Sequence, residues 1–186
     1  MTKPQRTVLD EEGIRQALKR ISDSIIKKDS PGLDVVLIGI QHGGVHLANR
    51  LSKLLKDSWN IDVPVGCLDI SMHRDDLDQR MIPDIKPTIV PFDITGKTVI
   101  LVDDVIFKGR TVRAAMDALN DLGRPTRIQL AVLIDRGHRE LPIHPDFVGK
   151  TVDTSLHDNV QVMLKEEGDK EAVIIESDEL ESQTST

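Results

Sequence analysis

Cysteine, aromatic residues and long apolar runs are all scarce in this chain of 186 residues. The single cysteine, Cys67, excludes an internal disulfide and a cysteine-based zinc site. Aromatic residues make up 2% of the chain and tyrosine is absent, so an aromatic platform that stacks nucleobases is not expected. No apolar run approaches the roughly 20 residues of a membrane span, and the first residues lack the apolar core of a signal peptide. These absences predict a cytoplasmic protein without a membrane partner.

The net charge of −7 is concentrated at the C-terminal end. Residues 165–186 carry eight acids and two bases, whereas residues 1–164 carry 23 acids and 22 bases. The body of the chain is therefore nearly neutral and lacks a strongly basic nucleic-acid footprint. The length suits one domain with a sizeable core. We predict a single domain over residues 1–175 and an acidic, disordered tail over residues 176–186.

Buried apolar runs alternate with amphipathic stretches along the body of the chain. Helices are predicted at 10–28, 45–56 and 111–122. Strands are predicted at 35–40, 63–71, 99–102, 128–134, 160–164 and 172–175. Residues 72–93 are polar, contain three prolines and show no period, which is typical of a functional or mobile loop. This alternation predicts an α/β fold whose mostly parallel central sheet is flanked by helices on both faces.

The segment at 98–122 combines a buried strand, two adjacent acids, a glycine-containing loop and a helix. Asp103 and Asp104 follow the strand, at the edge where open α/β sheets bind their ligands. Gly109 permits a tight turn, and the N–H groups of the helix that Thr111 begins attract an anion. This arrangement suits a ligand with a ribose hydroxyl pair and a phosphate, although an acid pair alone is also typical of a solvated turn.

Two further segments are placed to face a pyrophosphate. The loop after the strand at 35–40 contains two glycines and offers its backbone N–H groups to the ligand. Its residues are Gln41, His42, Gly43 and Gly44. A plain tight turn is the alternative interpretation of the same residues. Arg74, in the polar segment, is positioned to close over the ligand as active-site lids do, and a solvated loop of mixed charge is the alternative.

A third segment follows the strand at 128–134 and would border a base. Its members are charged or small and are Asp135, Arg136, Gly137, His138 and Arg139. The glycine would let a base approach the main chain, and a charged surface turn is the alternative reading. No histidine in the chain has metal-ligand spacing.

The string VILVDDVIFKGRT, at 99–111, resembles the phosphoribosyl pyrophosphate (PRPP) signature of the type I phosphoribosyltransferases. RGHRELPI at 136–143, LDISMHRDDL at 68–77 and FVGKTVDTS at 147–155 are similar to the pyrimidine operon regulator (PyrR) family of uracil phosphoribosyltransferases. The resemblance covers roughly residues 8–164. It implies the type I phosphoribosyltransferase fold, with a small hood beside the central sheet, in a homodimer or homotetramer.

The resemblance also implies an activity, in which uracil and PRPP with Mg²⁺ give UMP and pyrophosphate. Asp103 and Asp104 would hold the ribose hydroxyls, and these two acids together with Arg74 would be the catalytic residues. The 5-phosphate would be bound by the loop that follows, which comprises Val105, Lys108, Gly109, Arg110 and Thr111. No organic cofactor is implied.

The family further implies regulation of pyrimidine biosynthesis through binding to the leader RNA of pyrimidine-gene transcripts. Arg20 and Lys150 match positions that would contact the RNA backbone. Asp23, however, stands where the family carries a histidine on the same helix, and it adds a negative charge to a face meant for phosphate.

Other departures from the family bear on the chemistry. Phe107 occupies a position where purine-specific relatives carry a proton-accepting carboxylate, which favours a pyrimidine base. The loop at 41–44 has no full positive charge, and Lys108 stands where the family carries threonine. The uncharged loop and Lys108 would fit an alternative function, a uridine-nucleotide-responsive RNA-binding attenuation protein with weak or no transferase activity. A different acceptor base, or PRPP binding without chemistry, is a third interpretation.

Overall fold

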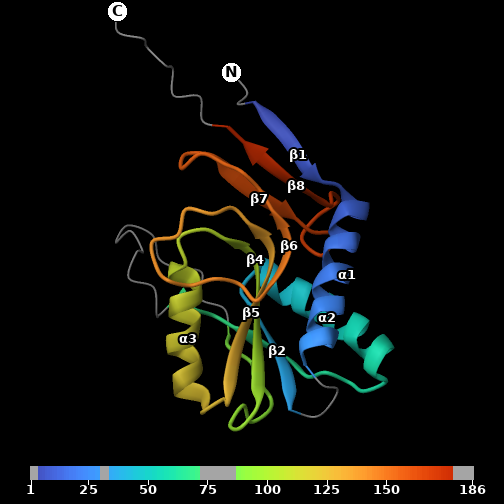
Figure 1. Cartoon of the computed structure of the whole chain (residues 1–186), viewed down its shortest axis with the longest axis vertical. Coiled ribbons are helices and arrows are strands. Elements are labelled where there is room, and N and C mark those ends of the chain that lie inside the picture. Colours follow the sequence, from blue (N-terminus) through green and yellow to red (C-terminus); the bar gives the residue numbers. More distant parts are fainter. Residues whose placement is uncertain (1–3, 30–33, 72–86, 178–186) are drawn as a thin grey trace, which may run out of the picture.

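The computed structural model describes residues 4–29, 34–71 and 87–177, and its centre is a parallel sheet (Figure 1). The strands of this sheet are β2 (Val35–Ile40), β3 (Val65–Leu68), β4 (Thr98–Ile106), β5 (Arg127–Asp135) and β6 (Phe147–Thr151). They lie in the order β3-β2-β4-β5-β6, and every neighbouring pair is parallel. The α/β fold expected from the alternating pattern is confirmed.

Helices cover both faces of this sheet (Figure 1). On one face, α1 (Glu11–Lys28) and α2 (Gly43–Trp59) pack against side chains such as Leu37, Ile100 and Leu133. On the other face, α3 (Arg110–Leu122) packs against the alternate residues of the same strands. Because β2 is buried along its whole length, its sequence is apolar throughout and does not alternate. No helix within the described ranges is long and apolar enough to cross a membrane.

A second, three-stranded antiparallel sheet forms the small hood (Figure 1). Its strands are β1 (Gln5–Leu9), β7 (Asn159–Met163) and β8 (Ala172–Glu176), in the order β1-β8-β7. The two ends of the described chain meet here, because Gln5 pairs with Glu176. The hood therefore joins the N-terminal strand to residues that lie beyond the central sheet in the sequence.

Several boundaries differ from the sequence-based expectations. The expected strand at 63–71 is shorter, and β1 and β6 were not expected at all, because five-residue strands carry a weak periodic signal. Helix α2 begins at Gly43 and not at residue 45. The acid pair lies within β4 and not beyond its end, because β4 continues to pair with β5 as far as Ile106. The predicted boundary between domain and tail, at residues 175 and 176, stays a prediction.

Candidate active site

The carboxyl ends of β2 and β4 and the start of α3 meet around two adjoining cavities. The larger, of about 430 Å³, is lined by Gln41, His42, Gly43, Asp103, Asp104, Val105, Thr111 and Glu167. The smaller, of about 120 Å³, is lined by Asp103 and the run from Val105 to Val112. Because β2 and β4 are adjacent and parallel, the loops that follow them lie at the same sheet edge, as open α/β sheets require of a ligand site. Arg74 lies outside the described residues.

The acid pair is held by local backbone hydrogen bonds. Asp103, whose exposed fraction is 6%, accepts the N–H of Asp104 at Oδ1 over 2.9 Å. Asp104 in turn accepts the N–H of Val105 at Oδ1 over 2.7 Å. Burial raises the pKa of the Asp104 carboxyl, and the hydrogen bond from the Val105 N–H partly offsets that rise because it favours the ionised form. Both carboxyl groups line the larger cavity, so a pair of ligand hydroxyls can donate to them.

Two glycines allow the start of α2 to approach the acid pair closely. A Cβ on Gly44 would lie 2.2 Å from the carbonyl oxygen of Val102, and a Cβ on Gly43 would lie 2.7 Å from Oδ2 of Asp104. Only glycine fits either position without a displacement of the main chain or of the acid. The backbone of the loop at 41–44 thus lies against the acid pair, and Gly44 packs on β4. The expected contact of this loop with a pyrophosphate stays a prediction.

The loop before α3 encloses the smaller cavity. Gly109, the N-cap residue of α3, has a φ of 92°, a left-handed conformation that other residues adopt only at a cost. No side chain caps this helix, so the N–H groups of its first turn are available to an anion. Lys108 and Arg110 both bind Glu140, from the loop after β5. The hydrogen bond from Lys108, and then that from Arg110, lowers the pKa of the Glu140 carboxyl.

The loop after β5 is shaped by its own side chains. Asp135 accepts the N–H of Gly137 over 2.9 Å and Nη2 of Arg139 over 2.6 Å. Gly137 and His138 both have positive φ, at 74° and 57°. Arg139 also donates from Nη1 to the carbonyl of Phe107 over 2.9 Å, so this loop is tied to the loop that precedes α3.

Phe107 is the contact between the two loops. The Arg136 guanidinium lies 4.1 Å from the Phe107 ring centroid, and the His138 ring meets the same ring edge-on with centroids 5.8 Å apart. Arg136 is buried, donates from Nη2 to the carbonyl of Ser155 over 2.9 Å, and its Nε has no partner among the described residues. Burial lowers the pKa of this guanidinium. Arg136 and His138 thus help to shape the loop. The sequence alone did not indicate this role.

The structure adds one residue that the sequence analysis missed. Glu167, between β7 and β8, lines the larger cavity beside the acid pair. Its loop is anchored to α2, where Arg50 binds both Glu166 and Glu171. His46 lies 3.6 Å from Oε1 of Glu167. No motif could have indicated Glu167, because it belongs to an acid-rich stretch that resembles a solvated segment.

The two expected RNA contacts lie on one face of the molecule. Arg20 donates from Nη2 to the carbonyl of Gly149 over 2.9 Å, which places it next to Lys150. Lys150 donates from Nζ to the carbonyl of Val8 over 3.2 Å. Asp23 is paired with Lys19, so part of its negative charge is neutralised locally.

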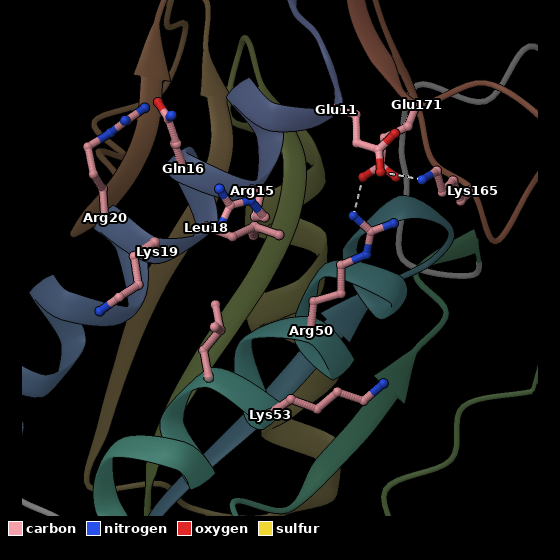
Figure 2. A pocket seen from close by; sticks show the side chains of 11 residues that line it. Glu11, Arg15, Gln16, Leu18, Lys19, Arg20, Arg50, Lys53, Lys165 and Glu171 are labelled. Atoms are coloured by element: carbon pink, nitrogen blue, oxygen red, sulfur yellow. Dashed lines mark hydrogen bonds and ion pairs between the residues drawn. The ribbon is translucent and has the colours of Figure 1, made fainter.

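A groove of about 760 Å³ lies between α1 and α2, and Arg20 is at one end of it (Figure 2). Its side chains come mainly from these two helices, with Lys165 and Glu171 added from the hood. Within the groove, Glu171 accepts from Arg50 and Glu11 accepts from Lys165. The structure thus places Arg20, at the end of this groove, against the residue that precedes Lys150.

Comparisons with known proteins connect this geometry to a family. The model of the phosphoribosyl transferase domain matches residues 4–167. The bifunctional protein PyrR of Chloroflexus aurantiacus is 54% identical, with 92% of this chain and 94% of the relative covered. The protein of the same name from Pelotomaculum thermopropionicum is 52% identical over 96% of this chain and all of the relative.

Solved structures show a similar fold. A hypoxanthine-guanine phosphoribosyltransferase from Bacillus anthracis aligns with a TM-score of 0.66 at 20% identity, and the alignment covers 95% of this chain and 99% of the other. A purine phosphoribosyltransferase from Pyrococcus horikoshii aligns with a TM-score of 0.60 at 25% identity, over 77% of this chain and 85% of the other. The type I phosphoribosyltransferase fold expected from the sequence is confirmed.

Proposed function

Because the chain belongs to the phosphoribosyl transferase domain family and, within it, to the bifunctional PyrR proteins, we propose that it transfers the phosphoribosyl group of PRPP to uracil. The products are UMP and pyrophosphate, and the protein also regulates pyrimidine biosynthesis. The observation that supports the activity most directly is the pair of adjoining cavities at one sheet edge. One has the two carboxylates that a ribose needs, and the other has the helix start that a phosphate needs.

In the transfer, the bond between the anomeric carbon and the pyrophosphate oxygen breaks as the carbon bonds to N1 of uracil. The bond electrons leave with pyrophosphate, and the N1 proton is released to water. Asp103 and Asp104 orient the sugar by accepting hydrogen bonds from its hydroxyl groups. Their negative charge stabilises the positive charge that develops on the ring in the transition state. The loop at 105–111 holds the 5-phosphate, so the anomeric carbon has one position relative to the base.

The remaining contacts are assigned by position. The backbone at 41–43 faces the pyrophosphate from across the larger cavity, and Arg74 is proposed to approach from the other side. The loop at 135–139 borders the base, where Gly137 leaves the main chain accessible because nothing lies within 4 Å of its missing Cβ.

Mg²⁺ fits the larger cavity on the chemistry of its donors. This ion prefers oxygen ligands and is commonly held by one or two carboxylates together with substrate phosphates. Asp103, Asp104 and Glu167 line this cavity, but no three such side chains among the described residues are grouped as metal ligands, so one or two carboxylates would hold Mg²⁺ together with oxygens of the pyrophosphate. When bound, Mg²⁺ neutralises charge on the pyrophosphate and makes it a better leaving group.

Replacement of the acid pair tests the activity. We expect Asp103→Ala and Asp104→Ala each to lower kcat/KM for uracil transfer by roughly 10- to 100-fold, because each removes a hydrogen bond to a charged acceptor worth about 1.5–3 kcal/mol. The assay is product formation from PRPP with a panel of free bases. Transfer to a purine in preference to uracil, or no transfer by the unaltered protein, would contradict the proposal.

A second function, binding of a pyrimidine-gene leader RNA in response to uridine nucleotide, is favoured by the proximity of Arg20 and Lys150. We expect Arg20→Ala and Lys150→Ala each to weaken binding and to reduce its salt dependence by about one phosphate contact. The measurement is a gel-shift titration with and without UMP at several salt concentrations. Unchanged binding by both variants would remove this face from the proposal. A homodimer or homotetramer in the cytoplasm is the proposed state of the protein.

A further inference from the structure

Lys108 and Arg110, the two cationic side chains that line the smaller cavity, bind the same carboxylate. Nζ of Lys108 lies 2.6 Å from Oε1 of Glu140. Nη2 and Nε of Arg110 lie 2.8 Å and 3.1 Å from Oε2. Each carboxylate oxygen of Glu140 therefore accepts from a different cation of the proposed 5-phosphate loop.

The main chain keeps Glu140 next to this loop. Its N–H donates to the carbonyl of Lys108 over 3.0 Å, and Leu141 and Ile143 lie 3.6 Å from where a Cβ on Gly109 would be. The three charged side chains, in contrast, are 39–42% exposed, so they can rotate between partners. The carboxylate is thus tethered, whereas the Lys108 ammonium and the Arg110 guanidinium can exchange it for another anion.

A phosphate that enters the smaller cavity competes with Glu140. It has more acceptor oxygens than a carboxylate and up to two negative charges. It can also accept hydrogen bonds from the N–H groups at the start of α3. Exposed ion pairs are individually weak, so this exchange is energetically accessible. The lysine matters particularly, since Lys108 occupies the position where a hydroxyl is expected and its long side chain must move to reach a phosphate.

We propose that Glu140 is a positioning residue that sets the affinity of this loop for the phosphate of its ligand, because it holds Lys108 and Arg110 in ion pairs that the phosphate must displace. The assignment of the phosphate to this loop rests on the proposed function. In the empty site both cations are paired with Glu140, whose single negative charge offsets one of their two positive charges. In the occupied site they bind the phosphate, and Lys108 supplies the contact that a hydroxyl makes in relatives.

The direction of the effect separates this role from a purely structural one. If Glu140 served only to hold the loop in shape, its replacement would weaken phosphate binding. If it competes with phosphate, Glu140→Gln strengthens binding, since glutamine preserves the shape and removes the charge. Asp117→Asn is the matched control, because Asp117 is exposed on α3, also lies beside an arginine, and does not line either cavity.

The experiment measures binding of ribose 5-phosphate and UMP by titration calorimetry, together with kcat and KM for PRPP. We expect Glu140→Gln to lower both dissociation constants and the KM for PRPP by roughly 3- to 10-fold, as two weak ion pairs would allow, with kcat within about twofold. Lys108→Thr should reduce this gain, because one of the two competing ion pairs is then absent. Asp117→Asn should change neither constant.

Unchanged or weaker binding by a Glu140→Gln variant with an unaltered melting temperature overturns the proposal, as does the absence of ribose 5-phosphate binding by the unaltered protein. Binding is measured without catalysis, so the two proposals fail separately. If the unaltered protein does not transfer to uracil but its Glu140→Gln variant binds UMP more tightly, the role of Glu140 stands and the proposed activity is lost. If the unaltered protein transfers to uracil but Glu140→Gln does not bind UMP or ribose 5-phosphate more tightly, the proposed activity stands and the role of Glu140 is lost.

Discussion

The environment of Asp104 disfavours the ionised form of its carboxyl. Burial in the cavity wall raises the pKa of its carboxyl, and the negative charge of Glu167 contributes in the same direction. The folded protein consequently retains a proton on Asp104 at pH values where the unfolded chain has released it. A ribose hydroxyl donates best to an ionised carboxylate, so under the proposed function Asp104 serves ligand binding, while its burial opposes folding at neutral pH.

The raised pKa of Asp104 makes the stability of the folded protein depend on pH in a definite direction. Between the ordinary pKa of an aspartate and the raised value, the folded state binds more protons than the unfolded state, so stability falls as pH rises through that window. We expect the Asp104→Asn variant to have a higher melting temperature than the unaltered protein at pH values above this window. Below the window this difference should disappear. Thermal melts from about pH 3 to 8 measure the difference. A difference that does not vary with pH would contradict the assignment.

At the scale of elements, the junction between β2 and α2 sets how closely the helix approaches β4. Gly39 and Gly44 both lie where a Cβ would meet main-chain atoms, with Val45 Cα at 2.4 Å from the first and Val102 O at 2.2 Å from the second. The helix start is therefore pressed onto the strand that carries the acid pair. A side chain at Gly44 would displace α2 from β4, and a side chain at Gly39 would displace the start of α2 from β2.

We expect Gly44→Ala to destabilise the protein by about 1–3 kcal/mol, because the added methyl overpacks a junction of two main chains. Gly168→Ala is the control, since nothing lies within 4 Å of its missing Cβ. Urea denaturation of both variants measures the two free energies of unfolding. Equal stabilities would show that α2 can shift without cost.

At the scale of the whole molecule, Arg50 connects the hood to the body. From the middle of α2 it binds Glu166 and Glu171, more than 100 residues later in the chain, and the Glu171 side chain is 5% exposed. These contacts hold the loop that brings Glu167 to the active site. The hood is thus part of the larger cavity and not a separate appendage.

Arg50→Met should cost about 2 kcal/mol, because it leaves a largely buried carboxylate without its cation. It should also speed hydrogen exchange in β7 and β8 and raise KM for PRPP. Lys53→Met is the control, since Lys53 lies almost one turn away on α2 and is exposed. Exchange rates that stay the same in β7 and β8 would show that β-sheet pairing alone holds the hood.

The sequence indicated much of the central architecture because its signals are local. Buried apolar runs marked β2, β4 and β5, and the spacing of Ile14, Leu18, Ile21 and Ile25 marked the core face of α1. The acid pair and Gly109 could also be recognised, since a ribose and phosphate site needs these residue types in one short segment. Short edge strands such as β1 and β6 escaped, because they become strands only through partners that are far away in the chain.

By itself, then, the sequence determined the parallel sheet, the covering helices and the segment that forms the site, since each depends on burial or conformation within a few residues. Only the tertiary structure decided that Glu140 pairs with both Lys108 and Arg110, that Glu167 lines the cavity beside the acid pair, and that Arg50 anchors the hood. The reason is physical: a charge acts on whatever the fold brings within a few ångströms of it. Sequence distance carries no information about such contacts when 30 to more than 100 residues separate the partners.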